Sequence, residues 1–177
     1  MPQPLIIAIG NGACNIADGI QSQGLEGAKF AFLDTEPDDL NNHSGVGETV
    51  LLQGTEQERH VAINHLLAAD VGKVVVIACL GGRTGSYYAS LSARLAKLAG
   101  KSLVCVVTLP FDFEGTRCNV LANKSLGVIK ECTPDVLVFD NKELNAKHPD
   151  LGIIDAFNMV DKQVAESLRT IFISWLG

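Results

Sequence analysis

The sequence predicts an α/β protein of Rossmann-like type, in which helices cover both faces of a mostly parallel sheet and give three α/β/α layers. Apolar runs of strand length alternate with helical patterns along the whole chain, as βαβ units require. Residues 74–79 are apolar throughout, which is typical of a parallel strand buried on both faces. Glycine-rich segments at 10–15 and 81–86 follow two of the predicted strands, and ligands of such sheets bind at the carboxyl ends of strands.

The elements follow from these patterns and from their boundary residues. We expect strands at residues 5–9, 29–33, 48–52, 74–79, 102–109 and 136–139. We expect turns at 10–15 and 81–86, a polar irregular stretch at 38–47, and helices that end near Gln23 and span about 55–69, 86–99, 114–132 and 155–176. Thr55 and Glu58 have the spacing of a capping box, and Gly100 is placed to end a helix.

Composition limits the classes of function. The 177 residues suit one domain, and 47% hydrophobic with 19% charged residues suits a well-packed core. A net charge of −6 without a basic cluster argues against binding to nucleic acid or to an anionic membrane. No signal segment precedes the first strand, so we expect a cytoplasmic protein. The five cysteines lack metal-ligand spacing, and Cys14 lies near a helix start that could lower its pKa.

The first glycine-rich segment, at residues 10–15, fits a nucleotide cradle. It reads GxGxxN, so Asn15 stands where a dinucleotide fingerprint has its third glycine. Asp34 follows at about the distance of the ribose-binding acid, which is roughly 20 residues. One hypothesis is therefore an NAD-dependent oxidoreductase. The other is a mononucleotide site, in which Gly10 and Gly12 allow backbone N–H contacts and Asn15 reaches the ribose or base.

The second glycine-rich segment, at residues 81–86, distinguishes these hypotheses, because a simple dinucleotide fold needs only one. Thr84 and Ser86 add hydroxyl groups, and a helical pattern follows at once. The unpaired N–H groups and the positive dipole end of that helix suit a phosphate group. Two such segments on neighbouring strands could bind different parts of one oligophosphate chain.

Four segments occur in the order and spacing of the tubulin/FtsZ nucleotide-binding domain, at residues 6–15, 81–86, 106–115 and 137–141. The pattern T-x-P-F-x-F-E-G at 108–115 is especially similar to bacterial FtsZ, a cell division protein. The resemblance extends from Leu5 to the last helix and corresponds to the amino-terminal half of that family's architecture. It implies a single FtsZ-like domain over residues 1–177, without the family's second domain.

The resemblance also implies GTP or GDP as ligand, with Mg²⁺ as a further candidate. The residues it assigns are Gly10, Asn11, Gly12, Ala13 and Asn15 in the first loop; Gly81, Gly82, Arg83, Thr84, Gly85 and Ser86 at the phosphates; Glu114 and Arg117 at the ribose; Asn141 and Asp161 at guanine; and Glu36 near Mg²⁺ through water. Guanine suits a carboxylate such as Asp161, because its N1–H and N2 amino groups are adjacent donors.

The chain departs from the family pattern at several places. Arg83 and Tyr87 replace glycines of the phosphate signature, and residues 53–55 pass almost directly into a helix where the family has a loop that senses the γ-phosphate. The chain also ends at Gly177, before the family's water-activating loop. We therefore expect GTP hydrolysis to be weak, absent or dependent on a partner chain. The alternative is a degenerate FtsZ-like interaction module that no longer binds nucleotide.

The last predicted helix has an apolar stripe, and residues 171–176 are apolar on nearly every side. In the family this helix lies between two domains. We expect its outer side to support self-association as a homo-oligomer, because a large exposed apolar patch is unusual on a monomer.

Overall fold

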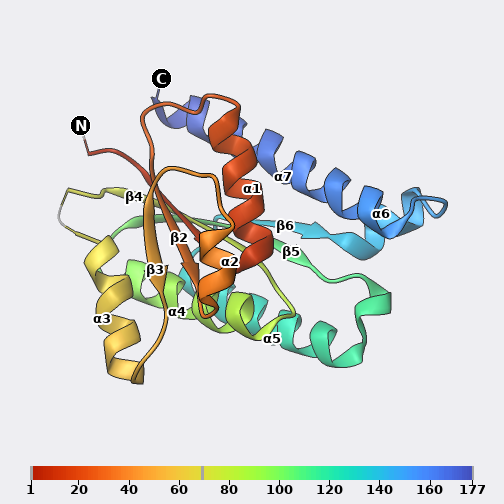
Figure 1. Cartoon of the computed structure of the whole chain (residues 1–177), viewed down its shortest axis with the longest axis horizontal. Coiled ribbons are helices and arrows are strands. Elements are labelled where there is room, and N and C mark those ends of the chain that lie inside the picture. The colour runs from red at the N-terminus through yellow and green to blue at the C-terminus, as the bar shows by residue number, and fades with distance from the viewer. Residues whose placement is uncertain (1, 69, 177) are drawn as a thin grey trace.

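A six-stranded parallel sheet forms the centre of the computed structural model, which describes residues 2–68 and 70–176. The strand order is β3-β2-β1-β4-β5-β6 (Figure 1). The strands are β1 (Leu5–Ile9), β2 (Lys29–Asp34), β3 (Glu48–Leu51), β4 (Lys73–Cys79), β5 (Ser102–Leu109) and β6 (Val136–Asp140). Every pairing among them is parallel. The expected α/β class and the six expected strands are thus confirmed.

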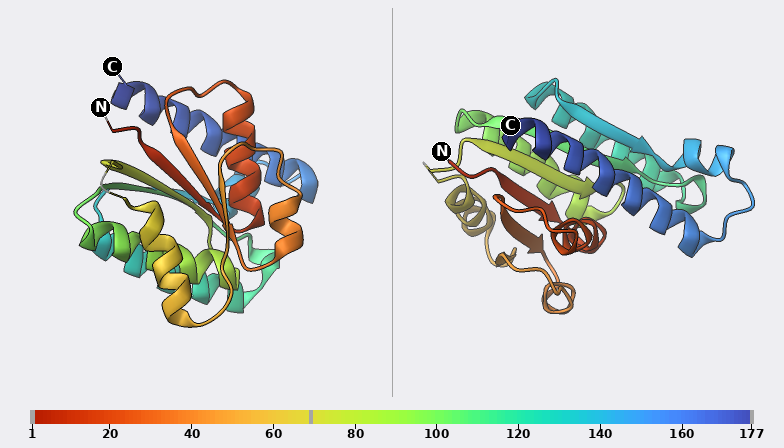
Figure 2. Two further views of the ribbon diagram at one scale, coloured as in Figure 1. Left: turned by 60° about the vertical axis from the view of Figure 1, so that its left-hand side comes forward. Right: turned by 90° about the horizontal axis from the view of Figure 1, so that it is seen from above.

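Helices cover both faces of the sheet (Figure 2). One face carries α3 (Glu56–Leu66), α4 (Arg83–Leu98) and α5 (Thr116–Cys132), and the other carries α1 (Asn11–Ser22) and α7 (Ile153–Leu176). Alternate residues of β1 enter the two cores: Ile7 and Ile9 face the first set of helices, and Ile6 and Ala8 face the second. The right-handed βαβ connections place the start of each following helix at the carboxyl edge of the sheet.

The two glycine-rich segments are helix starts, which corrects the turns expected there. Helix α1 begins at Asn11, directly after Gly10, whose φ of 84° lies in the left-handed region. Helix α4 begins at Arg83 rather than at Ser86. Both sets of first-turn N–H groups therefore belong to the glycine-rich segments themselves, which is the arrangement that binds anions.

Two short helices were not expected from the sequence. Helix α2 (Pro37–Asn41) lies in the stretch expected to be irregular, and it has Pro at its first position with Asp38 and Asp39 in its first turn. Helix α6 (Asn141–Lys147) is capped by the Asp140 side chain, which accepts a 2.9 Å hydrogen bond from the Lys142 nitrogen. A 3₁₀ turn, η1 (Asp112–Glu114), precedes α5.

The expected caps of α3 and α4 are present. Thr55 and Glu58 form the reciprocal capping box of α3, which ends at Leu66; the expected end near Ala69 lies outside the described residues. Gly100, after α4, has a φ of 68°.

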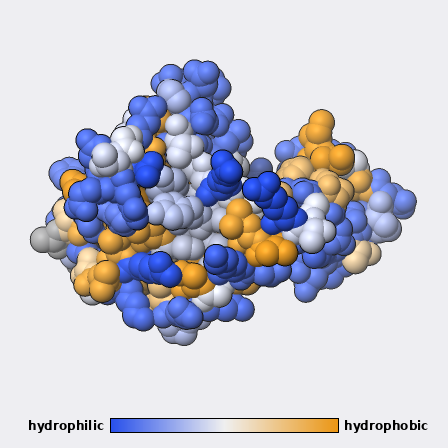
Figure 3. All heavy atoms as spheres, turned by 90° about the horizontal axis from the view of Figure 1, so that it is seen from below, coloured by the Kyte–Doolittle hydropathy of each residue, from blue (hydrophilic) through white to orange (hydrophobic). Residues whose placement is uncertain are grey.

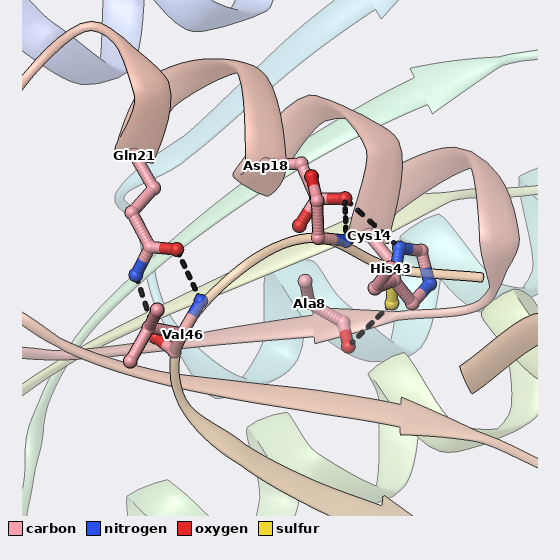
Figure 4. Close-up of polar contacts among 7 residues, drawn as sticks. Ala8, Cys14, Asp18, Gln21, His43 and Val46 are labelled. Carbon is pink, nitrogen blue, oxygen red and sulfur yellow. Dashed lines mark hydrogen bonds and ion pairs between the residues drawn. The ribbon is translucent and has the colours of Figure 1, made fainter. Parts of the chain in front are cut away.

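The loop after α2 is bound to α1 by a polar cluster (Figure 4). Asp18 Oδ2 lies 3.1 Å from His43 Nδ1 and accepts a 3.3 Å hydrogen bond from the Ser44 nitrogen. One turn later, the Gln21 amide both donates to and accepts from the backbone of Val46. These contacts fix the acidic segment that leads from β2 to β3, and so they fix one wall of the site described below.

Near the end of helix α7, the large aromatic side chains face the protein, so less apolar surface is exposed than the sequence of residues 171–176 suggests. Phe172 is fully buried, and Trp175 is partly buried against Phe172, with Lys73 Nζ 5.1 Å from its ring centroid. Ile173 is 64% exposed and Ser174 is exposed beside it. No helix in the described residues is long and apolar enough to cross a membrane.

Candidate functional site

The two glycine-containing helix starts lie side by side, because β1 and β4 are neighbouring strands. A Cβ placed on Gly10 would stand 3.9 Å from the Gly85 backbone nitrogen. A Cβ placed on Gly12 would stand 2.9 Å from the Sγ of Cys79, the last residue of β4. The start of α1 therefore packs directly on the end of β4 and on the first turn of α4. This convergence is the central feature of the site.

Serine hydroxyl groups hold the first turn of α4 in place through hydrogen bonds to its backbone. Ser86 Oγ accepts a 2.9 Å hydrogen bond from the Gly81 nitrogen, and Ser125 Oγ donates to the Ser86 carbonyl oxygen at 2.7 Å. Ser90 lies 2.8 Å from Ser125 and donates to the same carbonyl group. Ser86 is buried, and its hydroxyl is bonded to the Gly81 nitrogen, so its side chain stabilises the conformation of the turn.

A cavity of about 1110 Å³ opens above these helix starts, at or above the upper end of the usual range for small-ligand sites, roughly 300–1,000 Å³. Its lining includes most of the residues predicted at the phosphates and near Mg²⁺: Gly10, Asn11, Gly12, Glu36, Gly82, Arg83, Thr84, Gly85 and Ser86. The remaining predicted residues lie outside its lining: Ala13, Asn15, Gly81, Glu114, Arg117, Asn141 and Asp161. Arg83 is exposed at the first position of α4 and forms no ion pair with any described residue.

Of the residues predicted at guanine, Asn141 is buried and Asp161 is partly buried. Asn141, the first residue of α6, is 3% exposed, and its Oδ1 has no hydrogen-bond partner among the described residues. Burial raises the pKa of the Asp161 carboxyl on α7 above its usual range. The negative charges of Asp161 and Glu114 both help to raise the pKa of the Cys79 thiol, after the larger effect of burial, so both lie near the end of β4.

The two residues predicted at the ribose are exposed. Glu114 Oε2 accepts a 2.6 Å hydrogen bond from the Phe111 nitrogen, which closes the 3₁₀ turn before α5. Arg117 lies on the exposed side of the first turn of α5. The adjoining Asp112 forms a 3.1 Å ion pair with Lys142 of α6, and this ion pair joins the β5–α5 connection to the start of α6.

Asp34 forms a turn at the end of β2. It is 3% exposed, and its Oδ1 accepts hydrogen bonds from the Thr35 and Glu36 nitrogens at 2.7 and 3.2 Å. Asp34 also lines the cavity, at the end of β2, where the dinucleotide hypothesis places its ribose-binding acid. The turn aims Glu36 into the cavity, and Asp39, three residues later in α2, lines it as well.

Three residues near the site were missed in the sequence analysis. Thr35 contacts Thr84 across the cavity floor, and Asp39 lines the wall beside Glu36. Phe157 is 38% exposed one turn before Asp161 on α7, and its ring meets Phe111 edge-on at 5.0 Å between centroids. Only Asp39 had a local signal, its i+3 spacing from Glu36; the other two depend on contacts between distant segments.

The buried thiol of Cys14 is not a reactive group. Cys14 is fully buried, and burial raises its pKa to about 12. The expected effect of the helix start on this thiol is therefore wrong, because desolvation of the thiolate outweighs the helix dipole. No group of three or more His, Cys, Asp or Glu side chains suited to a metal occurs in the described part of the chain.

The model of the tubulin/FtsZ family GTPase domain matches residues 41–148. The chain belongs to the tubulin/FtsZ family. The cell division protein FtsZ of Aquifex aeolicus is 32% identical over 184 residues, which cover 94% of this chain and 50% of that protein. FtsZ 1 of Thermococcus kodakarensis is 30% identical over 188 residues, covering 94% of this chain and 48% of that protein. The chain thus spans about half the length of the curated relatives it matches.

Solved structures show the same fold. The empty FtsZ dimer of M. jannaschii superposes with a TM-score of 0.86 at 22% identity, over 97% of this chain and 55% of that one. The GDP-bound monomer of CetZ1 from Haloferax volcanii gives a TM-score of 0.81 at 18% identity, over 96% of this chain and 60% of that one. The FtsZ-like fold expected from the sequence is therefore confirmed.

Proposed function

We propose that this member of the tubulin/FtsZ family binds GDP or GTP at the carboxyl edge of its sheet. The observation that carries the proposal is the pair of helix starts, α1 and α4, whose Gly10 and Gly85 backbones approach each other closely. Each start offers backbone N–H groups and the positive end of a helix dipole, and both favour phosphate oxygens. Two such ends together suit the multiple charge of a di- or triphosphate.

The purine lies toward α6 and α7 in this proposal. The unpartnered Oδ1 of Asn141 would accept a hydrogen bond from guanine, and the Asp161 carboxylate would accept from N1–H and the N2 amino group. Adenine presents an acceptor at N1 and would leave that carboxylate poorly paired. The exposed ring of Phe157, on the same side of α7 as Asp161, would stack on the base.

Mg²⁺ fits the acidic wall of the cavity. The carboxylates of Glu36 and Asp39 line it, and oxygen atoms are the ligands that Mg²⁺ prefers. The ion would be held mainly by phosphate oxygens and water, with Glu36 acting through a water molecule. When bound, Mg²⁺ would neutralise phosphate charge close to these two carboxylates.

We further propose that the chain alone hydrolyses GTP slowly or not at all. The buried Asp34 carboxylate already accepts two backbone N–H groups through Oδ1, so that oxygen is occupied by the turn it forms. A partner chain that contributed an acidic group would then raise the rate. Phosphate release by the purified chain tests this: turnover of about 1 s⁻¹ or faster, an ordinary enzymatic rate, would contradict it.

Titration with fluorescent GDP and GTP in the presence of Mg²⁺ tests the binding proposal. We expect saturation at micromolar concentration, competition by unlabelled GDP, and little competition by ATP or NAD⁺. Asp161→Asn should weaken binding, whereas Lys162→Gln, at the exposed next position, should not. No saturation below about 1 mM would instead favour the degenerate interaction module, and stabilisation by NAD⁺ but not GDP would favour the dinucleotide hypothesis.

Self-association through α7 is the last part of the proposal. Ile173 is an exposed apolar residue in the carboxyl-terminal half of this helix, with the partly buried Ile171 and Trp175 beside it. The M. jannaschii FtsZ structure, a dimer, is consistent with assembly in this family.

A further inference from the structure

The cavity is longer than the phosphate-binding part of the site needs. Beyond the helix starts it continues over the outer face of α4, between α3 and α5. Its floor there consists of Tyr87, Ser90, Leu91 and Arg94, which recur at helical spacing and share one side of α4. The walls are formed from α3 by Glu56, Arg59 and His60, and from α5 by Leu121, Lys124, Ser125 and Val128. We call this part of the cavity the α4 groove.

The α4 groove is cationic in a chain that carries a net charge of −6. Its lining contains three cationic side chains, those of Arg59, Arg94 and Lys124, and one carboxylate, that of Glu56. A fourth cation, Arg83, lies where the groove meets the helix starts. Within residues 2–68 and 70–176, none of these four cations forms an ion pair. The buried Nε of Arg59 also has no hydrogen-bond partner there. The exposed guanidinium of Arg94 and the exposed ammonium group of Lys124 can both pair with carboxylates of a ligand.

Apolar side chains lie between these cations. Leu91, Leu121 and Val128 are at least partly covered, and Tyr87 is 49% exposed. Figure 3 shows the side of the molecule that carries α3, α4 and α5, where hydrophobic and hydrophilic residues are intermixed. Inorganic phosphate or a nucleotide tail would pair with the cations and leave the apolar residues in water. A ligand that satisfies both must carry carboxylates and apolar groups close together.

We propose that the α4 groove binds an acidic, apolar peptide segment of a partner protein. Its carboxylates pair with Arg94, Lys124 and Arg59, and its apolar side chains cover Leu91 and Val128. Arg83 and Arg94 are eleven positions apart, which is about 16 Å along the helix axis. An extended peptide covers that distance with about five residues, at roughly 3.3 Å each. Such a site would couple this domain to a partner beside the nucleotide, without using the guanine-binding residues.

The probe is a fluorescein-labelled peptide of about eight residues in which Glu and Leu alternate, long enough for this groove. Fluorescence anisotropy is measured without nucleotide, so the result does not depend on whether GDP binds. We expect saturable binding that weakens as ionic strength rises to about 0.3 M. Peptides with Gln at every Glu, or Ser at every Leu, should each bind at least about tenfold more weakly.

Charge reversal locates the binding. Arg94→Glu combined with Lys124→Glu should weaken binding of the Glu-Leu peptide by at least about tenfold. Lys130→Glu, on α5 outside the cavity lining, makes the same charge change as Lys124→Glu and should leave binding within about twofold. Thermal unfolding checks that each variant is folded. If the double variant has lost its fold, Lys124→Gln, at an exposed position of α5, replaces it and should also weaken binding.

Three results would overturn the proposal. The first is no saturation by the Glu-Leu peptide. The second is equal loss in Lys130→Glu and in Lys124→Glu measured alone, which would indicate attraction by overall charge only. The third is equal binding of the Ser-substituted peptide, or full competition by inorganic tripolyphosphate at the same concentration, which would make the groove a general anion site.

Discussion

The hydroxyl of Thr35, after β2, lies 3.0 Å from the hydroxyl of Thr84, in the first turn of α4. Strand β1 separates β2 from β4 in the sheet, so this contact passes over the carboxyl end of β1, where α1 begins. It joins the acidic wall of the cavity to the floor where we propose that phosphate binds. The position of Glu36, next to Thr35, therefore depends on the first turn of α4.

Thr84→Val should loosen this connection. It removes one hydroxyl and leaves the partly buried hydroxyl of Thr35 without that partner, so the free energy of unfolding should fall by about 1 kcal/mol. GDP affinity should fall by about tenfold, because a hydroxyl of the proposed phosphate site is lost as well. Chemical denaturation and GDP titration measure the two effects. Thr116→Val, at the exposed start of α5, is the control and should change neither.

Alanine at Gly85 should lower the stability of the fold, whereas alanine at Gly82 should leave stability nearly unchanged and weaken GDP binding. A Cβ on Gly85 would stand 2.4 Å from the Cys79 carbonyl oxygen, a backbone atom that cannot move aside, whereas a Cβ on Gly82 meets nothing within 4 Å. Gly85→Ala should therefore lower the free energy of unfolding by about 2–3 kcal/mol. Gly82→Ala should stay within about 0.5 kcal/mol but weaken GDP binding, because the methyl group enters the cavity. Equal stability of both variants would contradict this packing.

The strands could be predicted from the sequence because their signal is local. A run such as Val74–Cys79 is apolar for reasons that hold wherever it lies in a parallel sheet. The start of α4 could not be predicted in the same way. Arg83, Thr84 and Gly85 have no apolar periodicity, and Gly85 is a poor helix former. Glycine is required at position 85 because a side chain there would collide with the Cys79 carbonyl oxygen at the end of β4. Only folding brings these two residues together.

The candidate site also has one part that local sequence predicts and another part that it does not predict. The proposed phosphate side follows from local glycine patterns, and the lining of the cavity includes most of the residues that those patterns predict. The purine side depends on residues far apart in sequence. Asn141 lies in the short polar helix α6, where Leu144 is the other buried residue. One buried leucine gives no hydrophobic periodicity, so the sequence does not indicate that Asn141 is buried. The α4 groove likewise requires α3, α4 and α5 to be assembled before its cations lie together.

Binding of guanine nucleotide should weaken on acidification through Asp161. Burial raises the pKa of this carboxyl, so it becomes protonated at a higher pH than an ordinary aspartate does. Because the ionised form accepts the guanine donors, affinity should fall as pH drops through that raised pKa. GDP titrations across mildly acidic pH measure this. Asp161→Asn should bind about 10- to 100-fold more weakly at neutral pH and show a flatter profile; the nucleotide's own titration is common to both proteins.

The same shift predicts the effect on stability. An acid whose pKa is raised by folding stabilises the fold below its unfolded pKa, and this contribution is lost as pH rises through the folded pKa. At neutral pH the half-buried charge of Asp161 therefore opposes folding of the ligand-free protein. Asp161→Asn should be at least as stable as the unsubstituted chain there. A clear loss of stability would show that Asp161 has a structural role instead.

Self-association should depend on Ile173. Its side chain is 64% exposed on α7, whereas Trp175 packs against Phe172 and Lys73. Ile173→Glu should therefore shift the protein toward monomer with little loss of stability, while Trp175→Glu should also destabilise the fold. Thr116→Glu, at an exposed polar position of α5 on the other face of the sheet, is the control. Sedimentation velocity at micromolar concentration measures the state; a monomer whose sedimentation is unchanged by Ile173→Glu would rule out α7 as the interface.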